Sequence, residues 1–204
     1  MQDLLFLQSL WIGLAIAAPV GPIGVLVIQR TLHGGVRVGL ATGLGAAVAD
    51  ATYGAVGAYG VTGLIAWLQG ARVPLALAGG TFLLWLAWRT WWSEPPAAGG
   101  PALSSSRLLP TFAGAVALTL SNPATILSFV AIFGALAGGG APAVPGLMVA
   151  GVLAGSALWW LLLCGAVGVL RGRFDARWQG RVGRLSALML AAFALWQWGS
   201  LLAP

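Results

Sequence analysis

The sequence predicts an all-α integral membrane protein with six transmembrane helices, built as an inverted repeat of three plus three. Charged residues are only 7% of the 204 residues and the mean hydropathy is +0.93, whereas about a quarter of the residues in soluble domains are charged. No charge occurs from residue 108 to residue 170, which is about three times the roughly 20 residues that one membrane helix needs. The apolar runs also lack the two-residue alternation of membrane barrels, so we expect helices.

The repeat is predicted from backbone breaks at matching places in the first and fourth spans. Pro19 and Pro22 interrupt one apolar run and Pro123, after an asparagine, interrupts another; each proline removes a helical hydrogen-bond donor. Gly13 lies nine residues before Pro22, and Gly114 lies nine residues before Pro123. In hydrocarbon, such breaks are tolerated only where protein or a water-filled cavity satisfies the freed groups. Matched breaks in two repeats are typical of a transporter's binding site.

We expect a single transmembrane domain over residues 1–204, with one repeat over about 1–95 and the second over about 108–204. Residues 93–107 are rich in Pro, Gly and Ser, which is typical of a linker. The first span is expected to be retained in the mature protein. A signal peptide has a positively charged region before its apolar run, whereas this chain has Asp3 and no positive charge there. The expected spans are about 4–28, 39 to just before 68, 73–92, 108–136, 145–170 and 185–202.

The arginines predict how these spans are oriented. Nine of the ten lie in or beside loops one, three and five, and only Arg72 lies on the other side. Cytoplasmic loops carry the excess of basic residues, so we expect both termini outside the cytoplasm of a bacterial inner membrane. The fifth loop, about 171–184, is either a basic loop that fixes topology or an interfacial helix, since Phe174 and Trp178 stand four residues apart among its arginines.

Asp50 is the strongest single candidate for a functional residue within the membrane. It lies eleven residues into the second span, which places it about 16 Å deep at the helical rise. An acid at that depth is costly and points to an ion or substrate pathway, and a group that favours its neutral form when desolvated suits proton binding and release. Tyr53 shares its helix face. The alternative is a protonated Asp50 that only makes a hydrogen bond to a neighbouring helix.

Polar groups at the two breaks complete the expected site. An amino acid needs donors for its carboxylate and acceptors for its ammonium, and half-helix N-termini and freed carbonyls can supply both. The alternative is that the breaks are kinks for packing. We expect Asp50 to couple transport to protons, and we expect the transport path to include Pro19, Gly21, Pro22, Asp50, Tyr53, Asn122, Pro123 and Thr125.

The sequence disfavours enzymes and cofactor proteins. It has no lysine, so neither a Walker A lysine nor a Schiff base can form. It shows no paired carboxylates, histidine cluster or HExxH motif, so we expect no enzyme, no cofactor and no metal site. A basic charge carried by cytoplasmic loops does not predict nucleic-acid binding. Glycines at every fourth residue, at 35, 39 and 43 and at 151 and 155, predict close helix packing and leave a homodimer seam open.

Two sets of motifs carry a family resemblance. They are Gly21-Pro22, the run to Arg30, Gly34-Gly35, Gly39, Gly43 and Asp50 in the first half, and Ser121-Asn122-Pro123-Ala124-Thr125-Ile126 with Phe129 in the second. Together these motifs resemble the LysE/RhtB family of amino-acid exporters over nearly the whole chain. The resemblance implies a secondary exporter of amino acids or related small metabolites in the bacterial inner membrane, driven by protons or the membrane potential. It also implies that Gly21, Pro22, Asp50, Asn122 and Pro123 lie at the transport path.

Three other functions stay open at this point. A thiol redox carrier in the membrane would need two facing cysteines, whereas the chain has only Cys164. A metal-ion carrier should show His, Cys or several acids along its path. A non-transporting membrane scaffold would have no use for Asp50 or for matched helix breaks.

Overall fold

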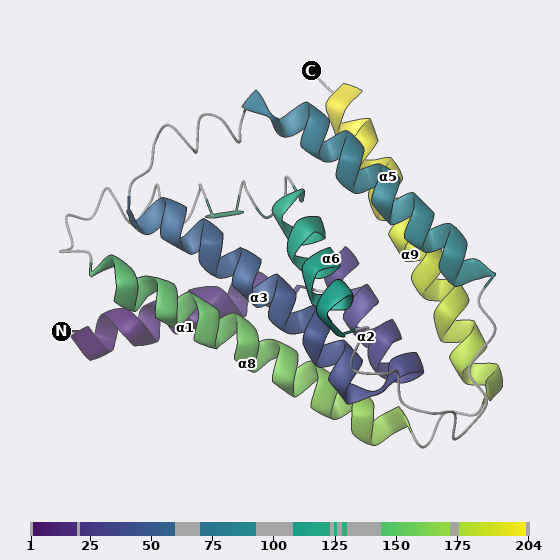
Figure 1. The fold of residues 1–204 in the computed structure, drawn as a ribbon, viewed down its shortest axis with the longest axis horizontal. Helices are drawn as coiled ribbons and strands as arrows, with labels where there is room; N and C mark the ends of the chain where they lie inside the picture. Colours follow the sequence, from purple (N-terminus) through teal and green to yellow (C-terminus); the bar gives the residue numbers. More distant parts are fainter. Residues whose placement is uncertain are drawn as a thin grey trace.

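In the computed structural model, every regular element of the described residues is a helix, as predicted (Figure 1). The described residues are 2–19, 21–59, 70–92, 108–122, 125, 128–129, 144–171 and 176–202. Pro123 and the linker at 93–107 lie outside them. The helices are α1 (Gln2–Ala17), α2 (Pro22–Gly34), α3 (Val36–Ala58), α5 (Arg72–Trp91), α6 (Leu108–Leu120), α8 (Pro145–Arg171) and α9 (Ala176–Leu202).

The first apolar run forms two helices with a sharp change of direction between them. α1 and α2 are bent by 78° to each other. Pro19 and Pro22 have no N–H, so the carbonyls of Ala15 and Ala18 cannot receive their usual helical bonds. Gly21 precedes α2 in an extended conformation, with φ −94° and ψ −167°, and Pro22 occupies the first turn of α2, where proline is favoured.

A single residue joins α2 to α3. Gly35 has a φ of 89°, which lies in the left-handed region that glycine adopts at little cost. Its N–H donates to the Thr31 carbonyl at 3.0 Å and so closes the end of α2. The α2–α3 corner therefore needs no loop.

The helices pack in two groups around a shared core. α3 packs against α2, α6 and α8, and α8 packs also against α1, while α5 and α9 lie along each other (Figure 1). α2 reaches both groups, because it contacts α3 and α8 as well as α9. The main core cluster includes Val27, Leu83, Cys164 and Leu190, which come from α2, α5, α8 and α9.

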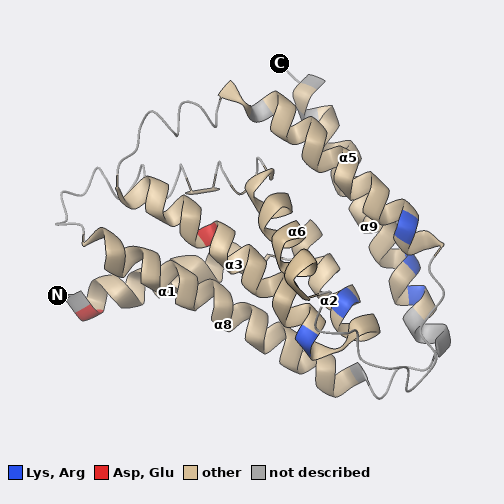
Figure 2. Cartoon of the chain, viewed as in Figure 1, with Lys and Arg blue, Asp and Glu red and all other residues tan. Residues whose placement is uncertain are grey.

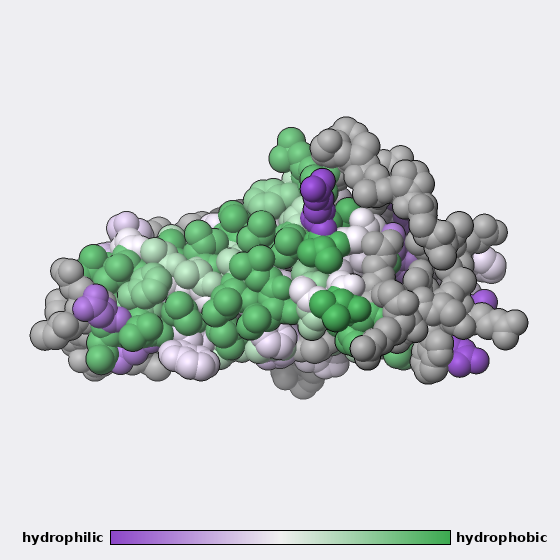
Figure 3. All heavy atoms as spheres, turned by 90° about the horizontal axis from the view of Figure 1, so that it is seen from below, coloured by the Kyte–Doolittle hydropathy of each residue, from purple (hydrophilic) through white to green (hydrophobic). Residues whose placement is uncertain are grey.

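Apolar side chains cover much of the surface. Hydrophobic side chains predominate in the described part of the face shown in Figure 3, and leucine and tryptophan are the most frequent of the exposed large hydrophobic side chains. Among the described helices, the segment Pro145–Leu170 of α8 is long and apolar enough to cross a bilayer alone, with a mean hydropathy of 2.1. α1 and α2 together would make a second, bent span. The six spans in their 3+3 order stay a prediction.

The last helix begins earlier than the expected span. That span was expected over about 185–202, whereas α9 begins at Ala176. Arg177, Arg181 and Arg184 therefore belong to a helix, as in the helical alternative for this stretch and not the loop. Arginine is a good helix former, so a basic stretch beside an apolar run can extend the helix beyond it.

Candidate functional site

A cavity of about 280 Å³ lies where the α1–α2 break faces α3, the end of α6, α8 and α9. It brings together six of the residues expected on a transport path. Pro19, Gly21 and Pro22 line it from the break, and Asp50 lines it from α3. The other two are Asn122 and Thr125, which follow α6.

Asp50 is buried and held by the second half of the chain. It is 4% exposed, and the Ser156 hydroxyl on α8 donates to its Oδ2 at 2.8 Å. Trp160 Nε1 in turn donates to Ser156 Oγ at 3.2 Å. An indole N–H can only donate, so the serine proton is directed to the carboxyl group. Asp50 thus both lines the cavity and accepts a hydrogen bond from a neighbouring helix.

The beginning of α2 points backbone donors at the cavity. Gly21, Pro22, Ile23 and Gly24 all line it, and no side chain caps this helix. The Val25 N–H bonds back to the Gly21 carbonyl at 3.0 Å, but the first N–H groups of a helix have no partner within it. Such an end attracts anionic groups.

The end of α6 adds a hydroxyl and an amide. Thr119 lines the cavity and is 3% exposed, and its Oγ1 has no hydrogen-bond partner among the described residues. A buried polar atom of this kind calls for a ligand or a water. The backbone here is closed by short-range bonds, from the Asn122 N–H to the Thr119 carbonyl at 3.1 Å and from the Thr125 N–H to the Asn122 carbonyl at 3.1 Å.

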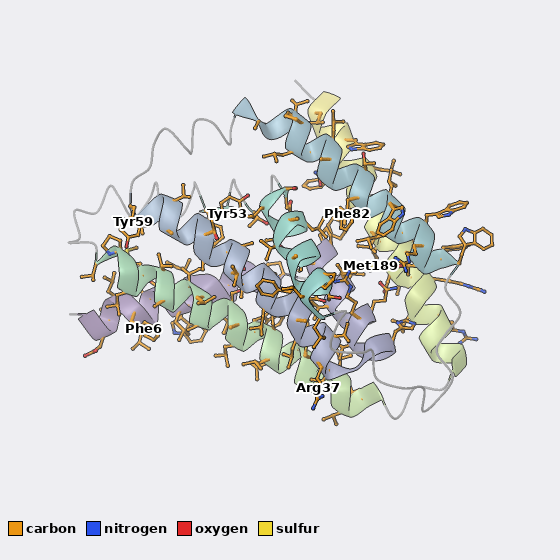
Figure 4. The ribbon with its side chains drawn as sticks, in the orientation of Figure 1. Phe6, Arg37, Tyr53, Tyr59, Phe82 and Met189 are labelled. Carbon is orange, nitrogen blue, oxygen red and sulfur yellow. The ribbon has the colours of Figure 1, made fainter. Side chains whose placement is uncertain are left out.

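Tyr53 does not line the cavity. Its hydroxyl donates to the carbonyl of Leu120, the last residue of α6, and its ring packs against Phe129 with centroids 5.7 Å apart. Figure 4 shows Tyr53 on α3, on the side of α6. It therefore satisfies one of the carbonyls that a helix end leaves open.

Several aromatic and polar residues of the lining were not predicted. Trp160 lies on α8, and Phe193, Trp196 and Gln197 lie on α9. Trp196 is 64% exposed and lies at the cavity rim. The sequence did contain a signal for Ser156 and Trp160 of α8. Ser156 is a lone polar residue in an apolar run, four positions before Trp160, so the two share a helix face.

Arg30 lies apart from this cavity. Its Nη1 donates to Thr42 Oγ1 of α3 at 3.1 Å and to the Thr111 carbonyl of α6 at 3.4 Å. The one cysteine, Cys164, is buried and receives a hydrogen bond from Thr31 at 3.6 Å. Within the described part of the chain, no group of three His, Cys, Asp or Glu residues could hold a metal ion.

Comparison with known proteins gives this geometry its context. Residues 14–196 match the model of the LysE type translocator family. The chain is 31% identical to an uncharacterized membrane protein, YahN of Escherichia coli strain K12, over 82% of this chain and 75% of the relative. It is 32% identical to the chemotactic transduction protein ChpE of Pseudomonas aeruginosa strain PAO1, over 85% of this chain and 87% of the relative. No solved structure matches the chain.

These matches confirm the resemblance noted in the sequence. They make the chain a membrane protein and a transporter rather than an enzyme. It belongs to the family of LysE type translocators.

Proposed function

We propose that the protein is a secondary active exporter of amino acids or related small metabolites across the bacterial inner membrane, coupled to protons or to the membrane potential. The cavity carries this proposal. It combines one buried acid, Asp50, with the open N-terminal end of α2 and the polar groups that follow α6. A substrate ammonium can pair with the acid, and a substrate carboxylate can bind at the helix end.

The proposed inverted repeat is supported by the pattern of helix packing. α1 packs on α8 and α6 packs on α3, while α3 meets α8 and α5 meets α9. Exchanging α1 with α6, α3 with α8 and α5 with α9 leaves these four pairs unchanged, as a two-fold axis would. The close approaches also correspond, because Gly155 of α8 abuts the α1 backbone at Leu10 and Gly45 of α3 abuts the α6 backbone at Phe112.

Asp50 is the proposed coupling group. A carboxyl group in a dry site is far cheaper to keep neutral than ionised, so a proton can occupy it when no substrate is bound. A substrate ammonium would replace that proton and pair with the ionised form. One carboxyl group then serves proton and substrate in turn, which is an exchange mechanism.

The proposed orientation is supported by where the arginines lie. The arginines drawn in blue in Figure 2 gather toward one end of the helices, and Arg37 there is exposed and points away from the bundle (Figure 4). The positive-inside rule would put this end in the cytoplasm. Both termini would then lie outside it.

The test is a metabolite screen of growth medium. Cells that overproduce the protein should accumulate one or a few amino acids or related metabolites outside, compared with cells that lack it. Cells that overproduce the Asp50→Asn variant should resemble the cells without the protein, while the Asp3→Asn variant, in which an acid on the exposed first turn of α1 is lost, should export normally. The same metabolite concentrations in the media of all strains would contradict the proposal and favour a non-transporting membrane scaffold.

A further inference from the structure

We infer that the cavity selects a zwitterionic amino acid with an apolar side chain, rather than a basic or an acidic one. This inference rests on the proposed function and names the substrate class of the same site. It is drawn from the charge of the lining, from the unpartnered Thr119 hydroxyl and from an apolar wall formed by Ile16, Trp160, Phe193 and Trp196.

The side chains of the lining can pair with one charged group of the substrate, an ammonium. Asp50 is the one ionisable side chain among the described residues that line the cavity. A basic side chain would bring a second cation with no described acid to meet it. An acidic side chain would bring an anion with no described basic residue to meet it. Burying an unpaired charge is costly, so the substrate side chain should carry none.

The cavity also holds polar groups that could bind the substrate carboxylate. The N-terminal end of α2 supplies backbone donors, and Thr119 adds a buried hydroxyl without a described partner. A hydroxyl can donate to a carboxylate, and the same atom left unpaired costs free energy. An amine without a carboxylate would leave these donors unused, and a carboxylic acid without an amine would meet Asp50 with no cation.

Large apolar side chains form much of the remaining wall, beside polar residues such as Gln197. Ile16 comes from α1, Trp160 from α8, and Phe193 and Trp196 from α9. Aromatic rings bind apolar groups with a large contact area and interact with other rings in preferred geometries. A hydroxylated or amide side chain placed against these four apolar residues would lose hydrogen bonds to water.

The size of the cavity agrees with a substrate of this class. Its volume of about 280 Å³ lies near the lower end of the roughly 300–1,000 Å³ that is typical of small-molecule pockets.

The experiment uses the full-length protein in proteoliposomes. Counterflow of four labelled probes is measured one at a time: L-leucine, L-phenylalanine, L-lysine and L-glutamate. Two analogues of leucine are then tested as competitors of leucine counterflow. 3-Methylbutylamine lacks the carboxylate, and 4-methylpentanoate lacks the ammonium. We expect leucine and phenylalanine to exchange, lysine and glutamate to stay near the rate of empty vesicles, and both truncated analogues to compete at least tenfold more weakly than leucine.

Two variants test the named residues. Trp196→Ala should raise the half-saturating leucine concentration about three- to tenfold, the loss expected for one aromatic contact. Trp88→Ala is its matched control, because Trp88 is exposed to a similar degree, 68% against 64%, and lies on α5 away from the cavity. Thr119→Val keeps the side-chain shape and removes the hydroxyl, so it should raise the half-saturating concentration with little change in thermal stability.

The outcomes separate the two proposals. Exchange of lysine or glutamate in preference to leucine would overturn the apolar class and leave the exporter standing. No exchange of any amino acid, by protein that elutes as a single folded species, would overturn both. A Trp196→Ala variant that matches wild type, together with an unchanged Thr119→Val variant, would also overturn the inference.

Discussion

Ser156 and Asp50 join the two halves of the chain through one hydrogen bond. The serine hydroxyl on α8 donates to Oδ2 of the acid on α3 at 2.8 Å, and Ser156 itself is fully buried. The acid proposed to couple transport in one half is thus oriented by a side chain of the other. One carboxyl oxygen is occupied by this bond, and the other is left for the cavity.

Ser156→Ala should impair transport by freeing Asp50 from its fixed orientation. A hydrogen bond to an ionised group contributes about 1.5–3 kcal/mol, so we expect substrate exchange to fall about tenfold or more in proteoliposomes. Ser9→Ala is the matched control, since Ser9 is equally buried but bonds only to the Leu5 carbonyl of its own helix. Equal loss in both variants would mean that a buried serine matters only for packing.

Asp50→Asn should abolish efflux driven by a pH step while leaving membrane insertion and folding intact. The amide has the shape of the protonated acid and can still accept the Ser156 hydrogen bond, but it can neither release a proton nor carry a charge. Efflux is measured from proteoliposomes across an imposed pH difference, with Asp3→Asn beside it. If the Asp50→Asn rate equals that of wild type, Asp50 is a structural residue.

Cysteines placed at positions 21 and 122 should crosslink with a short bifunctional reagent in a Cys164→Ala background. Gly21 and Asn122 line the same cavity, and a side chain added at Gly21 meets open space. The control pair joins position 21 to position 146, at the far end of α8, where a side chain also meets open space. Crosslinking is read as a mobility shift on a gel. Equal yields for both pairs would contradict the shared cavity.

Tyr53→Phe should lower thermal stability more than it lowers transport. The hydroxyl satisfies the Leu120 carbonyl at the end of α6, and leaving such an acceptor unpaired costs about 1–3 kcal/mol. Thermal unfolding in detergent measures the effect. Tyr59→Phe serves as control because Tyr59 is 63% exposed. A large loss of substrate affinity at unchanged stability would instead return Tyr53 to the transport path, where the sequence placed it.

Reporter fusions at both termini should be active only when the reporter works outside the cytoplasm. The expectation follows from nine of ten arginines lying in or beside alternate loops. Pairs of enzymes that work only in the periplasm or only in the cytoplasm give the readout. Cytoplasmic activity at both ends would reverse the orientation.

The parts of the fold that could be predicted are those with a local cause. Pro22 begins α2 because its ring fits a first helical turn, and the change of direction before it follows from missing backbone donors. The basic stretch around Arg177 left both a loop and an interfacial helix open, and α9 includes it, because charge does not break a helix.

The cavity wall was harder to predict than the acid inside it. Asp50 stands out in any apolar run, whereas Trp160 looks like every other tryptophan of the chain. That Ser156 and Trp160 share a face is visible from their spacing. That this face meets Asp50 depends on the register in which α3 and α8 cross, and a single sequence does not encode that register locally.

The corner at Gly35 has a consequence for motion. With a single residue between them and a bond from Arg30 to Thr42 across them, α2 and α3 are tied at that end and should turn as one rigid body. Any change of access must then swing Asp50 together with α2. The flexible point of the first half is the proline break at the other end of α2. The hinge of the transporter and its substrate-binding site would then be the same few residues.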